Sequence, residues 1–385
     1  MSEFKSPNFR NEDGSAAPDI VGVTTFTSPY YFVPPSGTTA ERPSGDGLAP
    51  GMLRFNTDIG RLEVWRNDHW ATILGESPNL GVNGALGARG VWGAGRAPGY
   101  SNVLDYITIS TQGNATDFGD LTVARATEAA FSSSTRGLWA GGYDVPNFSN
   151  VIDSITFSST GNATDFGDIT FTRFNHGALS NSTRGILGGG QNPVGSQVNV
   201  IEYLTISANG NSIDFGDLTS TKDSPHGCAS SVRGIFFGGG DKNSGPYKNE
   251  LDYITIASLG NAQDFGDTTL ARTCVGACSN STRGVGGGGD VPGARTNVID
   301  FVTIATTGNA QDFGDLTQAR GTLDAASSST RAVFGAGRVD TPTSNTPVNT
   351  LDYVQIPTTG NAIDFGDLSV SRWVVSSCSN GHGGL

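Results

Sequence analysis

The chain has 385 residues with a formal net charge of −13, and its 55 glycines are about twice the average usage. Because nucleic acid is itself a polyanion, we expect no nucleic-acid partner for so acidic a chain. No stretch is apolar over the length that a membrane span requires, and residues 1–7 lack the apolar run of a signal peptide. We therefore expect no membrane insertion and no export by a cleaved signal.

Residues 1–50 predict an extended N-terminal arm, because they hold seven of the chain's 17 prolines and few aliphatic residues. Their one apolar cluster spans residues 21–33, and an exposed cluster of this kind usually docks on a partner or on its own domain. The residues of this cluster that we expect to serve in attachment are Phe26, Tyr30, Tyr31 and Phe32.

Residues 51–85 predict a small β-hairpin segment of two or three strands, separated by turns at residues 58–60 and 67–68. A segment of this size is not stable alone, so it is expected to oligomerise or to clamp on a partner. The attachment residues expected in it are Leu53, Phe55, Trp65 and Trp70.

The third predicted domain, residues 86–385, consists of internal repeats. Asp-Phe-Gly-Asp occurs six times, beginning at residues 117, 165, 214, 264, 312 and 364, so the period is 48 to 52 residues. Each unit predicts four short strands: an apolar strand ending in glycines, a strand of period-two alternation, the Asp-Phe-Gly-Asp strand, and a strand that begins with a basic residue. This period is typical of four-stranded propeller blades.

These units resemble the kelch repeat, in which an apolar run ends in Gly-Gly and is followed by an apolar-Tyr-Asp strand, a bulky aromatic residue and Arg-x-x-His. Here a phenylalanine replaces the usual tryptophan, and only His176 and His226 hold the histidine position after Arg173 and Lys222. The resemblance implies an all-β fold, a six-bladed kelch-like β-propeller. It also implies that the C-terminal strand, near residues 372–380, joins the first blade and closes the ring, since the first unit has no inner strand of its own.

The segment Arg54-Phe-Asn-Thr-Asp-Ile-Gly-Arg-Leu-Glu-Val-Trp65 looks like short elements of virion appendage proteins of tailed bacteriophages. With its glycine-rich kelch-like repeats, the chain resembles virion structural proteins of marine tailed phages, including those of cyanobacteria. The resemblance implies a location in the virion, as a tail-fibre, tail-associated or capsid-fibre component. We expect anchoring to other phage virion proteins through the N-terminal region, and a homo-oligomer in the particle.

Two repeat positions are basic throughout the repeats, one before the glycine-rich strand (Arg89 in the first unit) and one at the start of the inner strand (Arg125 in the first copy). Six-fold repetition predicts a structural role, in which the cation binds backbone carbonyls or a carboxylate between blades. The functional alternative is a sialidase-like arginine cluster on the axis. It is disfavoured because a catalytic set would break the repeat, and because no Ser-x-Asp-x-Gly-x-x-Trp box is present.

Other residues that could carry chemistry have simpler explanations. The repeated aspartates, such as Asp117 with Asp120, are calcium-ligand candidates, but turn hydrogen bonding explains them, so we expect no metal. His176, His226 and Glu128 could face a central channel, yet neither the tyrosine–cysteine set of a copper oxidase nor a Ser-His-Asp arrangement accompanies them. We therefore expect no cofactor and no enzymatic activity.

The four cysteines are too few for a disulfide framework and lack Cys-x-x-Cys spacing, which predicts reduced thiols. Cys228, Cys278 and Cys378 share a repeat position at which other copies carry Phe131 or an aliphatic residue. This pattern indicates burial as small apolar groups.

The connection after each glycine-rich strand departs from the repeat in length and content, and all six are expected on one face. In repeat scaffolds insertions collect on the binding face, and Tyr, Asp and Arg side chains suit stacking on and hydrogen bonding to a sugar. The candidate ligand-binding residues are Arg96, Tyr100, Tyr143, Asp144, Phe148, Asp241, Lys242, Tyr247, Arg295 and Arg338. The alternative, that these are tolerated surface loops, stays open.

The sequence therefore predicts a non-enzymatic bacteriophage virion structural protein that displays a β-propeller for contact with a host surface or a host cell-surface glycan. One alternative is a purely architectural or decoration protein that joins virion parts. The other is a carbohydrate-active enzyme on a propeller scaffold, because propellers host many functions.

Overall fold

The computed structural model describes residues 34–45, 48–66, 68–72, 88–144, 146–240, 247–340 and 345–385. The described residues form β-strands and no helix, so the all-β prediction is confirmed, and none of them belongs to a helix able to cross a membrane. The chain divides into two compact units, Met1–Gly75 and Glu76–Leu385. The domain boundaries predicted at residues 50 and 85 stay predictions.

The described residues of the first unit form one four-stranded sheet. Its strands are β1 (Ser36–Gly37), β2 (Leu53–Asn56), β3 (Arg61–Arg66) and β4 (His69–Thr72), in that order. β1 pairs with β2 in parallel, and the other pairs are antiparallel. The buried carboxylate of Glu63 contacts Arg42 and Arg54 and accepts a hydrogen bond from Asn56 at 3.1 Å. A polar network thus lies inside this sheet, and none of the described residues of the unit is a buried hydrophobic one.

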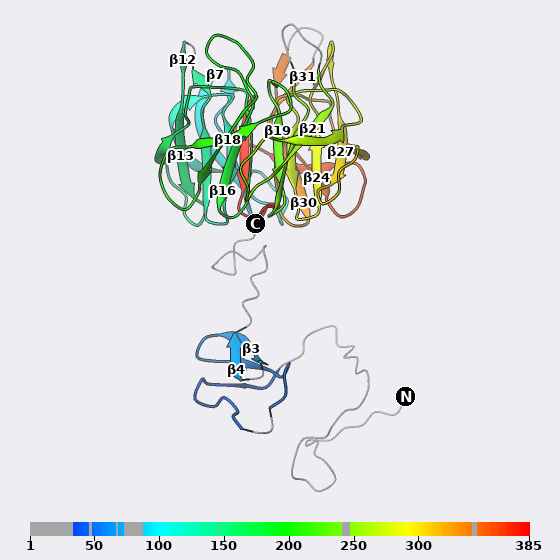
Figure 1. Cartoon of the computed structure of the whole chain (residues 1–385). Helices are drawn as coiled ribbons and strands as arrows, with labels where there is room; N and C mark the ends of the chain where they lie inside the picture. Colours follow the sequence, from blue (N-terminus) through cyan, green and yellow to red (C-terminus); the bar gives the residue numbers. More distant parts are fainter. Residues whose placement is uncertain are drawn as a thin grey trace. The chain divides into compact units, whose positions relative to one another are not determined.

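The second unit contains six sheets of antiparallel strands (Figure 1). Five follow the chain, in the orders β9-β10-β13-β14, β15-β16-β17-β18, β19-β20-β21-β22, β23-β24-β27-β28 and β29-β30-β33-β34. The first contains β9 (Ala129–Ser132), β10 (Arg136–Ala140), β13 (Val151–Thr156) and β14 (Thr164–Asp168), and the second contains β15 (Gly177–Ser180), β16 (Arg184–Gly188), β17 (Val200–Thr205) and β18 (Ile213–Asp217). The third contains β19 (His226–Ala229), β20 (Arg233–Phe237), β21 (Glu250–Thr255) and β22 (Gln263–Asp267), and the fourth contains β23 (Gly276–Ser279), β24 (Arg283–Gly287), β27 (Val298–Thr303) and β28 (Gln311–Asp315). The fifth contains β29 (Asp324–Ser327), β30 (Arg331–Gly335), β33 (Thr350–Gln355) and β34 (Ile363–Asp367).

The sixth sheet joins the two ends of this unit. Its strands are β35 (Ser376–Ser379), β5 (Arg89–Gly93), β7 (Gly99–Thr108) and β8 (Thr116–Arg125), with the short β6 (Arg96–Ala97) also paired to β7. β35 lies in the segment that the sequence assigned to the first sheet, and it pairs with β5 in the register Ser376 to Gly93. Three short hairpins complete the unit: β11 (Tyr143–Asp144) with β12 (Asn147–Phe148), β25 (Asp290–Val291) with β26 (Ala294–Arg295), and β31 (Arg338–Asp340) with β32 (Asn345–Pro347).

The Asp-Phe-Gly-Asp strand is the point where one sheet meets the next. Phe118 is buried, and Gly119 has a φ of 142° and lies so close to the Gly161 carbonyl that an added Cβ would meet its oxygen at 2.4 Å. Asp120 N donates to Asn162 Oδ1 at 3.1 Å. The same bond recurs from Asp168 to Asn211, Asp217 to Asn261, Asp267 to Asn309, Asp315 to Asn361, and Asp367 to Asn114. Glycine is therefore required here by close backbone approach.

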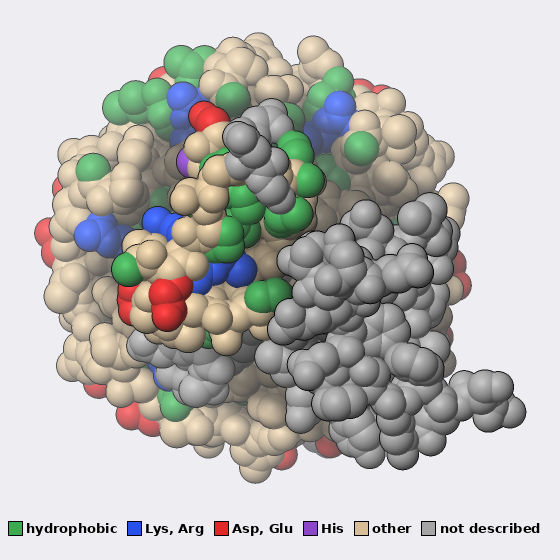
Figure 2. Space-filling view, turned by 90° about the horizontal axis from the view of Figure 1, so that it is seen from below, with side chains coloured by type: hydrophobic (Ala, Val, Ile, Leu, Met, Phe, Trp, Pro, Cys, Tyr) green, Lys and Arg blue, Asp and Glu red, His purple; other side chains and the backbone are tan. Residues whose placement is uncertain are grey.

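Most of the described surface seen in Figure 2 is neutral polar side chain and backbone, with acidic side chains both along the edge and nearer the centre of the view. The outer strands agree with this arrangement, because the first aspartate of the repeated turn, for example Asp165, is exposed while the phenylalanine beside it is buried.

The basic residue before each first strand is buried against a carboxylate of the third strand. The pairs are Arg125–Asp153 (2.9 Å), Arg173–Glu202 (2.9 Å), Lys222–Asp252 (2.9 Å), Arg272–Asp300 (2.8 Å), Arg320–Asp352 (2.8 Å) and Arg372–Asp105 (2.6 Å). Arg320 also donates to the carbonyls of Thr350 and Phe334, at 2.6 and 3.2 Å. The predicted structural role is confirmed, but these contacts tie segments of one sheet together and do not run between sheets.

The second basic position does bridge the sheets, as predicted. Arg184 Nη1 donates to the Ile256 carbonyl of the next sheet at 2.8 Å, while its guanidinium lies 4.7 Å from the ring centroid of Tyr203. Equivalent bonds join Arg89 to Phe157, Arg136 to Ile206, Arg233 to Ile304, Arg283 to Ile356, and Arg331 to Ile109.

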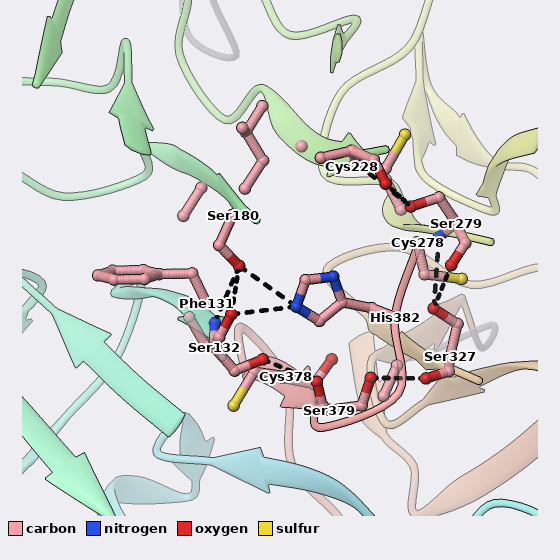
Figure 3. A pocket seen from close by; sticks show the side chains of 18 of the residues that line it. Phe131, Ser132, Ser180, Cys228, Cys278, Ser279, Ser327, Cys378, Ser379 and His382 are labelled. Atoms are coloured by element: carbon pink, nitrogen blue, oxygen red, sulfur yellow. Dashed lines mark hydrogen bonds between the residues drawn. The ribbon is translucent and has the colours of Figure 1, made fainter. Parts of the chain in front are cut away.

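Serine hydroxyls connect the first strands near their ends (Figure 3). Hydroxyl-to-carbonyl bonds run from Ser180 to Ser132, Ser132 to Ser379, Ser379 to Ser327, Ser327 to Ser279, and Ser279 to Ala229, at 2.6 to 2.8 Å. Ala229 has no hydroxyl to continue the series. The C-terminal residues lie at this end of the strands, where His382 Nε2 is 3.1 Å from the Ser132 carbonyl and Gly383 N donates to Ser279.

Breaking one buried ion pair is expected to be costly. Asp352→Ala leaves Arg320 buried without its counter-charge and should lower the free energy of unfolding by about 3–5 kcal/mol, measured by urea denaturation. Asp364→Ala, which alters an exposed aspartate of the same sheet, should change it by less than about 0.5 kcal/mol. Equal losses in the two variants would contradict the structural role of the pair.

The C-terminal strand is expected to hold the second unit together. A chain that ends at Arg372 loses β35 and its pairing with β5, and should unfold at a markedly lower temperature in circular-dichroism melts. Ser379→Ala removes only one buried hydroxyl bond and should cost about 1 kcal/mol. Unchanged melting of the shortened chain would refute this expectation.

Candidate functional site

The variable connections emerge at one end of the sheets of the second unit. Figure 1 shows β12 and β31 at the end opposite the C-terminus, and the described residues of these loops include eight of the predicted ligand-binding residues. We call this end the loop face. Asp241 and Lys242 lie outside the described residues.

Aromatic rings form a continuous cluster on the loop face. Tyr143 stacks on Phe148 with ring centroids 6.0 Å apart, and it contacts Phe174 at 5.1 Å and Tyr100 at 5.7 Å. All four side chains are half-buried, so each keeps some surface open to solvent. The cluster is held by strand pairing, since Tyr143 bridges to Ala126 beside the first strand of its sheet.

Two arginines extend this cluster across Trp373. The guanidinium of Arg96 lies 4.9 Å from the Tyr100 ring centroid and 5.4 Å from that of Trp373, and Arg338 lies 4.5 Å from the same indole. We call Phe174, Phe148, Tyr143, Tyr100, Arg96, Trp373 and Arg338 the aromatic–arginine array. Cation–π contacts of this kind attract a guanidinium to the face of an aromatic ring.

An ion-pair network borders the array. Asp290 contacts Arg295 Nε and Arg338 Nη2, each at 3.3 Å, and Arg295 also pairs with Asp340. Burial lowers the pKa of Arg295 from its usual value. Two carboxylates therefore neutralise Arg295 and Arg338.

The structure joins five of the predicted residues in the array, Arg96, Tyr100, Tyr143, Phe148 and Arg338, and places Arg295 beside it. It leaves two outside. Asp144 pairs with Asn147 within its hairpin, and Tyr247 bridges to Gly240 in another connection.

Sequence reasoning missed Phe174 and Trp373, which link the array. Each directly follows the buried basic residue of its repeat, where other copies carry Ala126, Asp223, Thr273 or Gly321. A bulky aromatic residue at a position that is otherwise small or polar was the available signal.

The eight predicted attachment residues all fall in the first unit, and the structure describes four of them. Phe26, Tyr30, Tyr31 and Phe32 lie outside the described residues. In the described part, Leu53 is 46% exposed, Phe55 is half-buried, and Trp65 and Trp70 contact each other with centroids 5.6 Å apart.

The first strands of the second unit enclose a small axial cavity of about 30 Å³. Glu128, His176, His226, Asp324 and Ser377 line it. His176 and His226 are not equivalent, which corrects the sequence prediction: His226 begins β19 as Gly177 begins β15, and His176 lies one residue earlier. Pro225 occupies the position of His176 in the third repeat.

Two carboxyl groups face this cavity from different sheets. Glu128 accepts a hydrogen bond from Ser376 Oγ at 2.7 Å, and Asp324 accepts bonds from Ala325 N and Ser377 N at 2.9 and 2.6 Å. Burial raises the pKa of each carboxyl to about 7, against the opposing influence of Arg125 and Arg372 on Glu128. Within the described ranges, no group of three His, Cys, Asp or Glu side chains is placed to hold a metal.

The imidazole of His176, which lines the same cavity, is uncharged. Burial and the nearby charge of Arg173 hold the pKa of His176 well below its usual value, so its imidazole is neutral at pH 7. The cysteines are free and buried, as predicted, and burial raises the pKa of the Cys228 thiol to about 12. A buried thiol with that pKa is a poor nucleophile.

The chain matches no protein-family model and no curated protein sequence at a significant level.

The raised pKa of Glu128 makes stability depend on pH. In the folded state the Glu128 carboxyl stays protonated up to about pH 7, whereas in the unfolded state it loses its proton near pH 4.5. The free energy of unfolding therefore falls as the pH rises between these two values. Glu128→Gln removes this linkage. At pH 8 the variant should be more stable than the parent by up to about 3 kcal/mol, and at pH 4 it should match the parent, in chemical denaturation. A constant difference across this range would contradict the burial of an ionisable Glu128.

Proposed function

We propose that the six sheets are the blades of a closed, six-bladed kelch-like β-propeller. Supporting this, the first strands contact one another in the cyclic order β9, β15, β19, β23, β29, β35 and again β9. The arginine bridges follow the same order, since Arg331 of the last repeat reaches Ile109 of the first sheet. The first-strand contacts and the arginine bridges thus each have six copies, which is what a closed ring requires.

We further propose that the chain is a non-enzymatic bacteriophage virion structural protein, a tail-fibre, tail-associated or capsid-fibre component, that touches a host surface or glycan with the loop face. The observation that carries this proposal is the aromatic–arginine array. Rigid, half-exposed rings and guanidinium groups on one face are the groups that bind sugars and protein surfaces with little entropic cost. They depart from the repeat, so the fold alone does not explain them.

The N-terminal region is proposed to anchor the chain to other virion proteins, in a homo-oligomer. The support lies in its size: a single four-stranded sheet with a charged interior gains stability by burying Trp65, Trp70 and the exposed Leu53 against a partner.

A carbohydrate-active enzyme is the second candidate, favoured by Glu128 and Asp324, whose carboxyl groups also depart from the repeat. A cavity of about 30 Å³ has room for one water molecule or two, far less than a sugar ring needs. The non-enzymatic function is therefore preferred, with a purely architectural role as its alternative.

The test is binding of the fluorescently labelled chain to a panel of candidate bacterial hosts. Tyr143→Ala removes the ring that touches three others and should weaken saturable binding at least about tenfold. The matched control is Val232→Ala, which alters a 62% exposed residue in a strand-to-strand turn and should bind normally. Melting temperatures of both variants confirm folding. No binding by the folded parent to any host would favour the architectural role.

A further inference from the structure

We propose that the aromatic–arginine array binds a polysaccharide that carries anionic groups, and that Arg96 receives the carboxylate or sulfate. This inference rests on the proposed function, because it names the ligand class of the same face.

Arg96 differs from Arg295 and Arg338 of the loop face because they pair with carboxylates. Asp290 and Asp340 neutralise Arg295 and Arg338, but among the described residues no carboxylate pairs with Arg96. Its Nε is buried without a hydrogen-bond partner, and within the described ranges neither terminal nitrogen forms a hydrogen bond or an ion pair. Among the residues that the structure describes, this cation is therefore held in place without a counter-ion.

The surroundings of Arg96 fix its orientation. The Tyr100 ring and the Trp373 indole both lie within 5.4 Å of the guanidinium carbon, and Arg96 N donates to the Trp373 carbonyl at 2.9 Å. A guanidinium that is already immobilised loses little side-chain entropy on binding, and its planar fork matches a carboxylate or sulfate through two parallel hydrogen bonds.

The rest of the array suits a sugar chain. Tyr100, Tyr143 and Phe148 are half-buried aromatic residues of the same array as Arg96, and pyranose rings pack their C–H faces on aromatic rings. An extended ligand would place its anionic group on Arg96 and the following units along these rings.

The net charge of the chain argues against non-specific binding of acidic polymers. At −13 the protein repels polyanions in general, so binding of an acidic polymer requires a local site. Arg96 supplies the local positive charge, and the aromatic rings distinguish a sugar chain from other polyanions.

The experiment measures binding of the full chain to three probes at one fixed ionic strength: polygalacturonate, which carries carboxylates, dextran sulfate, which carries sulfate esters, and neutral dextran. Affinity electrophoresis gives the dissociation constants. We expect binding to one or both acidic probes, little to dextran, and a loss of at least about tenfold in Arg96→Gln. The ratio between the two acidic probes identifies which anionic group is preferred.

Two further variants separate a specific site from a charge effect. Arg61→Gln makes the same change in net charge at an exposed arginine of the first unit and should leave binding unchanged. Arg96→Lys keeps the charge without the planar fork and should bind with intermediate affinity, which tests the site even if Arg96→Gln folds poorly.

The inference is overturned if dextran binds as tightly as the acidic probes, or if Arg61→Gln loses as much affinity as Arg96→Gln. It is also overturned if the folded parent binds host cells but neither acidic probe, and in that case the proposed function stands. Loss of acidic-probe binding in Arg96→Gln alone supports it.

Discussion

The second unit depends on a buried cation that meets a carboxylate in every sheet. An ion removed from water is stable in a protein only when its charge and hydrogen bonds are fully compensated, so the position of each cation is fixed by its carboxylate and by nearby carbonyls. The residue after each cation pairs with the end of the glycine-rich strand, as Ala126 does with Tyr143 and Trp373 with Arg96. The geometry of the loop face therefore follows from charges buried beneath it.

Glycine permits this arrangement because the sheets approach one another through their backbones. At Gly119 any side chain would collide with the next sheet, and at Gly185 an added Cβ would lie 2.1 Å from the Phe131 ring. The high glycine content is thus a consequence of tight packing between sheets. Stability comes instead from buried aromatic residues such as Trp92 and Trp139, which fill the space that the glycines leave.

Much of this fold could be predicted, because each strand and turn pattern occurs six times in the sequence. Strand order, the pairing of the C-terminal strand and the burial of the cysteines all followed from repeated positions. One error concerned all six copies, because the inner-strand cations bind carboxylates of their own sheet and not between sheets. The other errors came where one copy differs. In the third repeat Pro225 holds the position of His176, and the histidine is the next residue. Phe174 and Trp373 belong to the array because they contact residues of other sheets. Periodicity cannot reveal a contact that occurs once.

The difference between repeated contacts and contacts that occur once also helps to separate structural residues from candidate functional residues. Contacts present in all six sheets maintain the fold, and the loss of any one of them is expected to lower the free energy of unfolding. The array occurs on one part of the loop face, and the carboxyl groups of Glu128 and Asp324 occur once each. Arg96 occurs in a single copy, has no counter-ion among the described residues and lies against Tyr100 and Trp373, and for these reasons we propose it as the position of the ligand's anionic group.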